Sequence, residues 1–204
     1  MRGVFVTFEG IEGSGKSTQA SLFIDWCQEK GRKVIFLREP GSTSIGEKIR
    51  EVLLSLDYEN FYSQTELLLF LSARAQMVRE KISPALEKGV IVILDRYSDS
   101  TFAYQGYGEG IPLELIDKMN SFATSNLMPD ITFLLDIEIE EGLKRAGFKD
   151  RIEKKGLEFH RKVRDGYYQL TENSDGRIRI IKVKKDFSET QKEIREIFQK
   201  KFSL

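Results

Sequence analysis

The sequence predicts an α/β fold in which parallel strands form a central sheet with helices on both of its faces. Short runs of β-branched and aromatic residues alternate five times with segments whose apolar residues have helical spacing. The helical segments are long enough to cross over the sheet, and such crossovers require neighbouring strands to be parallel. We find no repeat, low-complexity tract or linker, so residues 1–204 are expected to form one domain. The strand order does not follow from these patterns.

The strands are recognised as short apolar runs that end at glycine, a charged residue or a turn. The first, VFVTFE, ends at Gly10, and the third, VIVIL, is the most hydrophobic. The predicted strands are Val4–Glu9, Lys33–Leu37, Val90–Leu94, Ile131–Leu135 and Ile178–Val183.

The helices are recognised from their apolar spacing and from residues that begin or end helices. Gly31 is a natural end for the first helix, and Pro112 fits the first turn of another. Ser63-Gln64-Thr65-Glu66 is predicted to form a capping box, Ser83-Pro84 to disturb the last turn of the helix that follows it, and Ser188-Glu189-Thr190-Gln191 to cap the terminal helix. The other predicted helices are Ser17–Lys30, Ser44–Leu54, Ser63–Lys81, Pro112–Leu127, Ile139–Ala146 and Leu157–Glu172.

Composition argues against several classes of partner. The 32 basic and 32 acidic side chains cancel, so no overall field favours nucleic acid or an anionic membrane. No apolar run is long enough to cross a bilayer, and the N-terminal residues do not resemble a signal peptide. The single cysteine, Cys27, cannot form an intramolecular disulfide. We therefore expect a cytoplasmic protein that binds neither nucleic acid nor a membrane.

The strongest motif is Gly10-Ile11-Glu12-Gly13-Ser14-Gly15-Lys16-Ser17, which fits the pattern G-x-x-x-x-G-K-[ST] of a P-loop. Its glycines let successive backbone N–H groups point at an anion, and the following helix adds the positive end of its dipole. Lys16 can reach the β- and γ-phosphates of ATP, and the Ser17 hydroxyl can bind Mg²⁺. We expect the ATP-binding residues to be Gly10, Ile11, Glu12, Gly13, Ser14, Gly15, Lys16, Ser17 and Thr18.

Asp95, at the end of the third strand, can share the same metal ion. The alternatives are a glycine-rich turn that binds no phosphate and an aspartate that only caps the next turn.

Basic residues after the strands point to an acceptor that is itself a phosphate. Arg38 follows the second strand and Arg96 the third, and Arg145, Lys149 and Arg151 follow the fourth. Ligands of parallel α/β folds bind at this edge, where two polyanions would need cations on both sides. A phosphate acceptor needs no general base, because its second pKa is about 6. Each of these cations could instead be an ordinary solvated charge.

Three blocks carry a specific resemblance. These are Arg38-Glu39-Pro40-Gly41-Ser42-Thr43, Phe70-x-x-x-Arg74 and Asp95-Arg96-Tyr97-x-x-Ser100-Thr101-x-Ala103-Tyr104-Gln105. From Val4 to about Glu172 the chain resembles the thymidylate kinase family. The resemblance implies a three-layer P-loop kinase fold with sheet order 2-3-1-4-5, an acceptor region at 39–110, a short lid at 143–153 and a homodimer. It also implies transfer of the γ-phosphate of Mg-ATP to dTMP, giving dTDP for dTTP biosynthesis.

The resemblance implies roles for individual residues. Arg38 and Arg96 would hold the acceptor phosphate, while Phe70 would stack on thymine and Arg74 would donate to its carbonyl. Thr101 and Gln105 would bind the edge of the base. Tyr104 would exclude a ribose 2′-hydroxyl, and Glu12 would reach the 3′-hydroxyl. Lys16, Arg96, Arg145 and Arg151 would be catalytic by neutralising the transferred phosphate, with Lys149 as a further candidate.

The chain also departs from the family pattern. Gly13 is not arginine, which in the family goes with catalytic arginines carried by the lid, yet this lid has few of them. Val183–Phe187 matches no adenine-contact pattern, so the preferred donor base stays open.

Two other functions remain open at this point. One is a kinase for deoxyuridine monophosphate or a mixture of acceptors, against which the combination of Phe70, Arg74 and Tyr104 argues. The other is a nucleotide-binding regulatory module without turnover, which would not require Asp95 and the cations after the strands.

Overall fold

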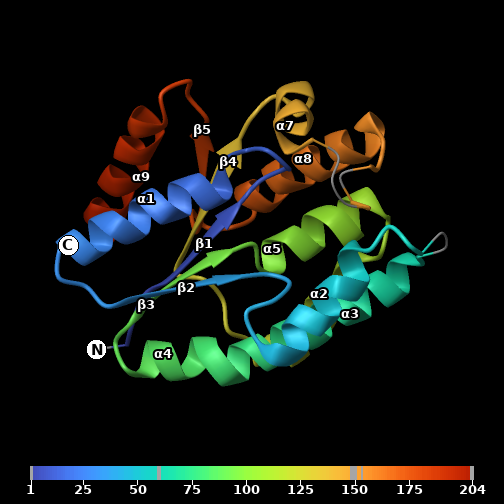
Figure 1. Cartoon of the computed structure of the whole chain (residues 1–204), viewed down its shortest axis with the longest axis horizontal. Helices are drawn as coiled ribbons and strands as arrows, with labels where there is room; N and C mark the ends of the chain where they lie inside the picture. The colour runs from blue at the N-terminus through green and yellow to red at the C-terminus, as the bar shows by residue number, and fades with distance from the viewer. Residues whose placement is uncertain (1, 59–60, 148–150, 153, 203–204) are drawn as a thin grey trace.

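The sheet has five parallel strands in the order β2-β3-β1-β4-β5, as the resemblance implied (Figure 1). The computed structural model describes residues 2–58, 61–147, 151–152 and 154–202. The α/β class and the five strands are confirmed, and each strand lies within one residue of its predicted bounds. The strands are β1 (Phe5–Glu9), β2 (Val34–Arg38), β3 (Ile91–Asp95), β4 (Ile131–Asp136) and β5 (Ile178–Lys182).

In the described ranges, α-helices and two π-helical segments connect the strands. The predicted bounds of α2, α7 and α8 are confirmed, whereas α5 and the π-helical segment η2 were not predicted. The helical elements are α1 (Lys16–Glu29), α2 (Ser44–Leu54), α3 (Ser63–Met77), η1 (Val78–Ile82), α4 (Ser83–Glu87), α5 (Ser98–Thr101), η2 (Phe102–Gly108), α6 (Leu113–Thr124), α7 (Ile139–Ala146), α8 (Leu157–Glu172) and α9 (Phe187–Phe202). No helix in the described part of the chain is both long and apolar enough to span a bilayer.

The two faces of β1 have different surroundings. Val6 and Phe8 point to the face covered by α1 and α9, where Phe8 packs against Phe23 at a ring-centroid distance of 6.0 Å. Successive side chains of a strand alternate between faces, so Thr7 and Glu9 point to the opposite face, which α5 and α8 help to cover. One face of β1 is therefore an aromatic core, and the other carries polar side chains that support the site.

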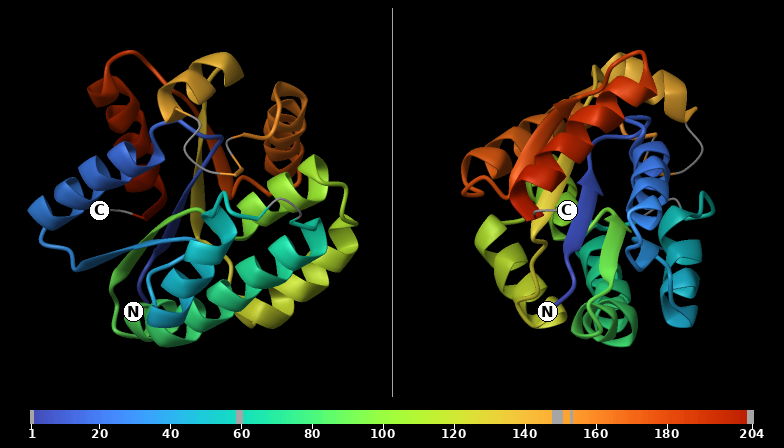
Figure 2. Two further views of the ribbon diagram at one scale, coloured as in Figure 1. Left: turned by 45° about the vertical axis from the view of Figure 1, so that its right-hand side comes forward. Right: turned by 90° about the vertical axis from the view of Figure 1, so that its left-hand side faces the viewer.

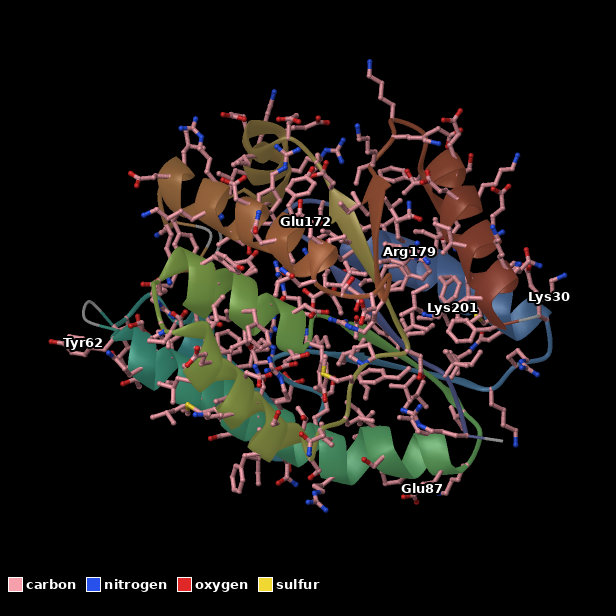
Figure 3. All side chains as sticks on the ribbon, turned by 180° about the vertical axis from the view of Figure 1, so that it is seen from behind. Lys30, Tyr62, Glu87, Glu172, Arg179 and Lys201 are labelled. Carbon is pink, nitrogen blue, oxygen red and sulfur yellow. The ribbon has the colours of Figure 1, made fainter. Side chains whose placement is uncertain are left out.

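The predicted capping box at the start of α3 is wrong. Tyr62, at the outer tip of the molecule in Figure 3, is the residue before the helix, and no side chain caps that end. The buried Glu66 carboxylate instead binds Gln105 and Arg151. The Glu66 side chain therefore binds partners from distant parts of the sequence and does not cap the start of α3.

Pro84 disturbs its helix as predicted, but the helix does not stop there. The backbone widens into the π-helical turn η1 just before Pro84, which cannot donate a backbone hydrogen bond, and then continues as α4. The terminal helix α9 starts earlier than predicted, because Asp186 accepts a hydrogen bond from the Ser188 amide and so caps it.

All five strands end at the same edge of the sheet. α1 begins at this edge and α7 lies over it (Figure 2). Loops at the carboxyl ends of parallel strands are where such sheets bind ligands. The predicted functional residues after β1, β2 and β3, together with Arg145 at the end of α7, are thus brought to one end of the molecule.

Candidate functional site

The P-loop joins β1 to α1 and is held in shape by its own lysine. The Lys16 ammonium donates to the backbone oxygens of Gly10, at 3.0 Å, and Ile11, at 2.8 Å. Gly13 and Gly15 have φ values of 68° and 87°, which a residue with a Cβ seldom adopts. Burial and the nearby Arg96 guanidinium lower the pKa of Lys16 to about 8. The loop has the backbone shape and the cation that a polyphosphate needs.

Gly13 also permits close contact between the P-loop and α7. A Cβ at this position would lie 1.9 Å from the backbone oxygen of Gly142. A Cβ on Gly142 would in turn lie 2.6 Å from the Glu12 backbone oxygen. An arginine at position 13 would not fit this arrangement, which gives a physical reason for the departure seen in the sequence.

Ser17 and Asp95 form a pair of hard oxygen ligands beside the P-loop. The Ser17 hydroxyl donates to Asp95 Oδ2 at 2.7 Å, because β1 and β3 are neighbours and Phe8 pairs with Asp95. A hydroxyl and a carboxylate suit Mg²⁺, which takes its other ligands from water and substrate phosphates. Among the described residues no cluster of three or more His, Cys, Asp or Glu side chains could hold a metal alone. The pair fits a magnesium ion that arrives with a nucleotide.

Glu12 projects from the P-loop into a ring of donors. Its Oε1 accepts from the Tyr104 hydroxyl at 2.6 Å and from Arg96 at 3.0 Å, and its Oε2 lies 3.3 Å from His160 Nδ1. Burial alone would raise the pKa of Glu12, but Arg96, His160, Lys16 and Tyr104 lower it well below its usual range. Glu12 is therefore a carboxylate in a nearly enclosed position.

Arg96 is held in place from behind by Glu9. Arg96 has a φ of 69° and donates to the hydroxyls of Ser100, at 3.2 Å, and Tyr167, at 3.4 Å. Both hydroxyls donate to Glu9 Oε2, at 2.5 Å and 2.8 Å. Burial, and then the nearby charge of Asp99, raises the pKa of Glu9 to about 7. Glu9 was not predicted as a site residue, although an acidic residue inside a buried strand is a signal for one.

A cavity of about 330 Å³ lies next to these groups and is called here the first cavity. The segment formed by α5 and η2 contributes one wall, and α3 contributes another. Every predicted acceptor-binding residue lines it, together with three residues that belong to none of the quoted motifs: Arg50, Leu54 and Ile152. Glu39, from the block that begins at Arg38, also lines it, although no role was predicted for its side chain. Its predicted lining residues are Glu12, Arg38, Phe70, Arg74, Arg96, Thr101, Tyr104 and Gln105.

Arg74 forms the floor of the first cavity and is almost fully enclosed. Its Nε donates to Glu39 Oε1 at 2.7 Å, and other donors of the guanidinium bind Thr101, at 2.7 Å, and Asn120. Burial raises the pKa of Glu39, while Arg74 opposes that rise. Arg74 therefore has a structural role that was not predicted, beside its expected contact with a base.

The other predicted acceptor residues differ in their partners. Arg38 is exposed and pairs with Glu47 at 2.9 Å. The Gln105 amide donates to the buried Glu66 carboxylate at 2.7 Å, which fixes its orientation at the cavity wall.

A second cavity, of about 540 Å³, lies on the other side of the P-loop. Arg145 lines it at the end of α7, where its guanidinium also pairs with Glu141 at 2.5 Å. The half-exposed ring of Phe187 lines the same cavity, although the segment 183–187 matched no adenine-contact pattern. The full lining is Gly13, Gly15, Lys16, Ser17, Thr18, Arg145 and Phe187.

The structure does not bring Arg151 to the P-loop. Its guanidinium pairs with Glu66 at 2.5 Å, lies over the Phe61 ring and lines neither of the two cavities. Its catalytic role therefore stays a prediction. Lys149 lies outside the described residues.

The chain is similar to several known thymidylate kinases. The family model described as thymidylate kinase matches residues 8–194. The thymidylate kinase of Thermoanaerobacter sp. (strain X514) is 43% identical over 203 residues, which cover 98% of this chain and 99% of that protein. That of Carboxydothermus hydrogenoformans is 50% identical over 184 residues, with 89% of each chain covered. The crystal structure of thymidylate kinase from Ehrlichia chaffeensis has 35% identity and a TM-score of 0.81, and the match covers 98% of this chain and 99% of that one. The chain therefore belongs to the thymidylate kinase family.

Proposed function

We propose that the chain phosphorylates dTMP to dTDP, with Mg²⁺-bound ATP as the phosphoryl donor. The observation that carries the proposal is that Gly13, Lys16 and Ser17 line both cavities. A donor in the second cavity and an acceptor in the first would then meet at the P-loop, beside Lys16 and Arg96. Holding the two reacting phosphates next to each other would accelerate the transfer, because a reaction between bound groups no longer requires two molecules to meet and orient in solution.

In the proposed reaction, an oxygen of the dTMP phosphate forms a bond to the γ-phosphorus of ATP. The bond from that phosphorus to the β,γ-bridging oxygen breaks, and ADP leaves. No side chain needs to remove a proton, because the acceptor phosphate is mostly a dianion at neutral pH. Lys16 and Arg96 neutralise the charge that develops. A magnesium ion bound by Ser17 and Asp95 would supply Lewis-acid stabilisation of the donor phosphates.

The first cavity offers a consistent place for each part of dTMP. Arg38 and Arg96 would bind the phosphate, Glu12 and Tyr104 would face the sugar, and Phe70 would stack on the base. Thr101, Gln105 and Arg74 would line the edge of the base. Since Thr101 accepts a hydrogen bond from Arg74, its hydroxyl proton can donate to an acceptor on the base.

Phe187 and Arg145 support placing the adenine of ATP in the second cavity. A half-exposed ring and a guanidinium near the P-loop offer flat faces on which a base can stack. Stacking of this kind would hold adenine and guanine alike.

The first experiment is a comparison of acceptors. ADP formation from Mg-ATP would be measured with the monophosphates of thymidine, deoxyuridine, deoxycytidine, deoxyguanosine and uridine. A strong preference for dTMP supports the assignment of the first cavity. Equal use of several acceptors would contradict the roles of Phe70, Arg74 and Tyr104, and binding of ATP without turnover would favour a regulatory module.

The second experiment tests the P-loop. Lys16→Ala should lower kcat by about 100-fold or more, because it removes one preorganised positive group from the transition state. Lys30→Ala, which changes an exposed lysine at the other end of α1, is the matched control and should keep normal activity. Near-normal turnover in Lys16→Ala would refute the mechanism.

We also propose that the protein is a cytoplasmic homodimer that pairs through α2, α3 and α6. These helices lie side by side (Figure 2), and Phe122 on α6 is 91% exposed. Large exposed apolar side chains that gather over one layer of helices are typical of an interface. The surface is formed by Ile45, Val52, Leu68, Leu115 and Phe122.

Its test is the mass measured by light scattering after gel filtration. Phe122→Glu should give monomers, whereas Phe36→Glu, at a 42% exposed position on β2, should stay dimeric. A monomeric wild-type protein would overturn this part of the proposal.

A further inference from the structure

His160 is the only histidine of the chain and lies beneath the Glu12 carboxylate. It belongs to α8, is fully buried, and packs edge-on against Phe159 at a centroid distance of 5.4 Å. The Phe159 ring in turn packs against Tyr104, 6.1 Å away. The histidine is thus fixed in a wall shared with the residues that surround Glu12.

The two carboxylate oxygens of Glu12 differ in their hydrogen bonds. Oε1 accepts two hydrogen bonds, from Tyr104 and Arg96. Oε2 is buried and has no hydrogen-bond partner among the described residues, and the same holds for both nitrogens of His160. Oε2 and Nδ1 are 3.3 Å apart, within ion-pair range, although no hydrogen bond joins them in the structure. A buried acceptor and a buried donor that face each other gain free energy from a small movement that pairs them.

We propose that His160 is a positioning residue for Glu12, and that its Nδ1–H donates to Oε2 and fixes the plane of the carboxylate. Two hydrogen bonds hold Oε1, but no hydrogen bond among the described residues holds Oε2, so only one side of the carboxylate is anchored. A hydrogen bond from Nδ1 would hold Oε2 as well, and Oε2 would keep its second lone pair for a substrate hydroxyl, whereas Oε1 already accepts from Tyr104 and Arg96. His160 therefore acts on the acceptor only through Glu12.

The inference rests on the proposed function, in which Glu12 accepts from the 3′-hydroxyl of dTMP. It requires that the effect of His160 depend on that hydroxyl. Replacing the histidine should therefore lower kcat/KM for dTMP. It should leave kcat/KM unchanged for the 3′-deoxy analogue of dTMP, which lacks the hydroxyl. A residue that only stabilised the fold would affect both acceptors equally.

The kinetic test uses three variants and two acceptors. His160→Leu should lower kcat/KM for dTMP by about tenfold, the effect of losing one hydrogen bond to a charged group. The same variant should leave kcat/KM for the 3′-deoxy analogue unchanged. His160→Asn should restore activity with dTMP, because its amide nitrogen lies where Nδ1 lies. His160→Gln, whose amide nitrogen lies nearer to the position of Nε2, should not.

The outcomes separate this inference from the function on which it rests. If wild-type enzyme uses the two acceptors equally well, the Glu12 assignment fails. If the wild-type enzyme prefers dTMP and His160→Leu lowers kcat/KM equally for both acceptors, the inference about His160 fails. The Glu12 assignment then still stands. Rescue by glutamine as good as rescue by asparagine would also overturn it.

A direct measurement needs no substitution. Because the chain has one histidine, a ¹⁵N-labelled sample gives a single imidazole signal pair in a nitrogen–carbon-proton correlation spectrum. A proton on Nδ1, and a change of that signal when dTMP is added, are the expected results. A ring protonated on Nε2 alone, or a signal that dTMP leaves unchanged, would overturn the proposal.

Discussion

Replacing Arg74 by methionine removes the guanidinium from a site where the side chains of Arg74 and Glu39 are only 1% and 2% exposed. The Glu39 carboxylate then loses its ion pair with Arg74, and its Oε2 already has no hydrogen bond among the described residues. Breaking a buried pair from one side costs about 3–5 kcal/mol, since it leaves an uncompensated charge inside the protein. In a chain of this length 1 kcal/mol shifts Tm by about 2–4 °C, so Arg74→Met should melt roughly 6–20 °C below wild type.

A double variant that also replaces Glu39 provides the decisive comparison. Arg74→Met combined with Glu39→Gln removes both charges, so most of the lost free energy of unfolding should return. The pH dependence follows from Glu39. Its pKa is raised in the folded protein, so Glu39 contributes most to stability when it is protonated, and that contribution is lost as pH rises through the raised pKa. Without Arg74 nothing opposes that rise, so Arg74→Met should be most destabilising at neutral pH and less so in acid.

Urea unfolding can be followed by fluorescence of the single tryptophan, Trp26, which is 6% exposed in the folded protein. Lys48→Met serves as the matched control, because Lys48 pairs with Glu51 on the surface and should contribute about 0–1 kcal/mol. The reasoning is refuted if Arg74→Met costs less than the control, or if Glu39→Gln adds to the loss instead of reversing it. The stable double variant should still have a raised KM for dTMP, which would separate the proposed contact of Arg74 with the base from its structural role.

Three further predictions concern the P-loop, the strand beneath it and the second cavity. Gly13→Ala should destabilise the protein more than Gly15→Ala in thermal unfolding, because both strain the backbone but only the first places a Cβ 1.9 Å from Gly142; equal losses would contradict the close contact with α7. Glu9→Gln should gain stability relative to wild type, by about 3 kcal/mol, between pH 5 and 8 in urea unfolding, since the wild type loses the contribution of protonated Glu9 as pH rises from 4.5 through about 7. A constant difference would show that Glu9 does not titrate in this range. Arg145→Met should raise KM for ATP by about tenfold and leave KM for dTMP unchanged; an equal rise in both would place Arg145 between the substrates.

The parts of the fold that the sequence predicts well depend on local signals. The bounds of α7 and α8 follow from apolar spacing, and the P-loop follows from glycine spacing after a strand. By contrast, η2 contains Gly106 and Gly108, which disfavour a helix on their own. At Gly108 a Cβ would lie 2.6 Å from the Phe159 ring, so the glycine permits close packing on α8 that no local pattern reveals.

The same limit applies to the site. The acceptor-binding residues were predicted from the resemblance, and they do line one cavity. Glu9 and His160 were missed because their partners are 91 and 148 residues away in the sequence, at Ser100 and Glu12. The capping box failed for a related reason, since Glu66 has charged partners that sequence spacing cannot show. The position of Arg151 depends on the same buried carboxylate.

In the proposed function Glu12 would belong to two binding sites at once, because its backbone is part of the loop that would cradle ATP while its carboxylate faces the first cavity. A ligand that binds on one side and orders this residue changes the free energy with which a second ligand binds on the other side. Such linkage is reciprocal: whatever factor dTMP applies to the affinity for ADP, ADP must apply to the affinity for dTMP. Calorimetric titrations in both orders would measure that factor twice, and Glu12→Gln should move both values together. The placement of one carboxylate in the P-loop would then couple the binding of the two substrates of this enzyme before any phosphate is transferred.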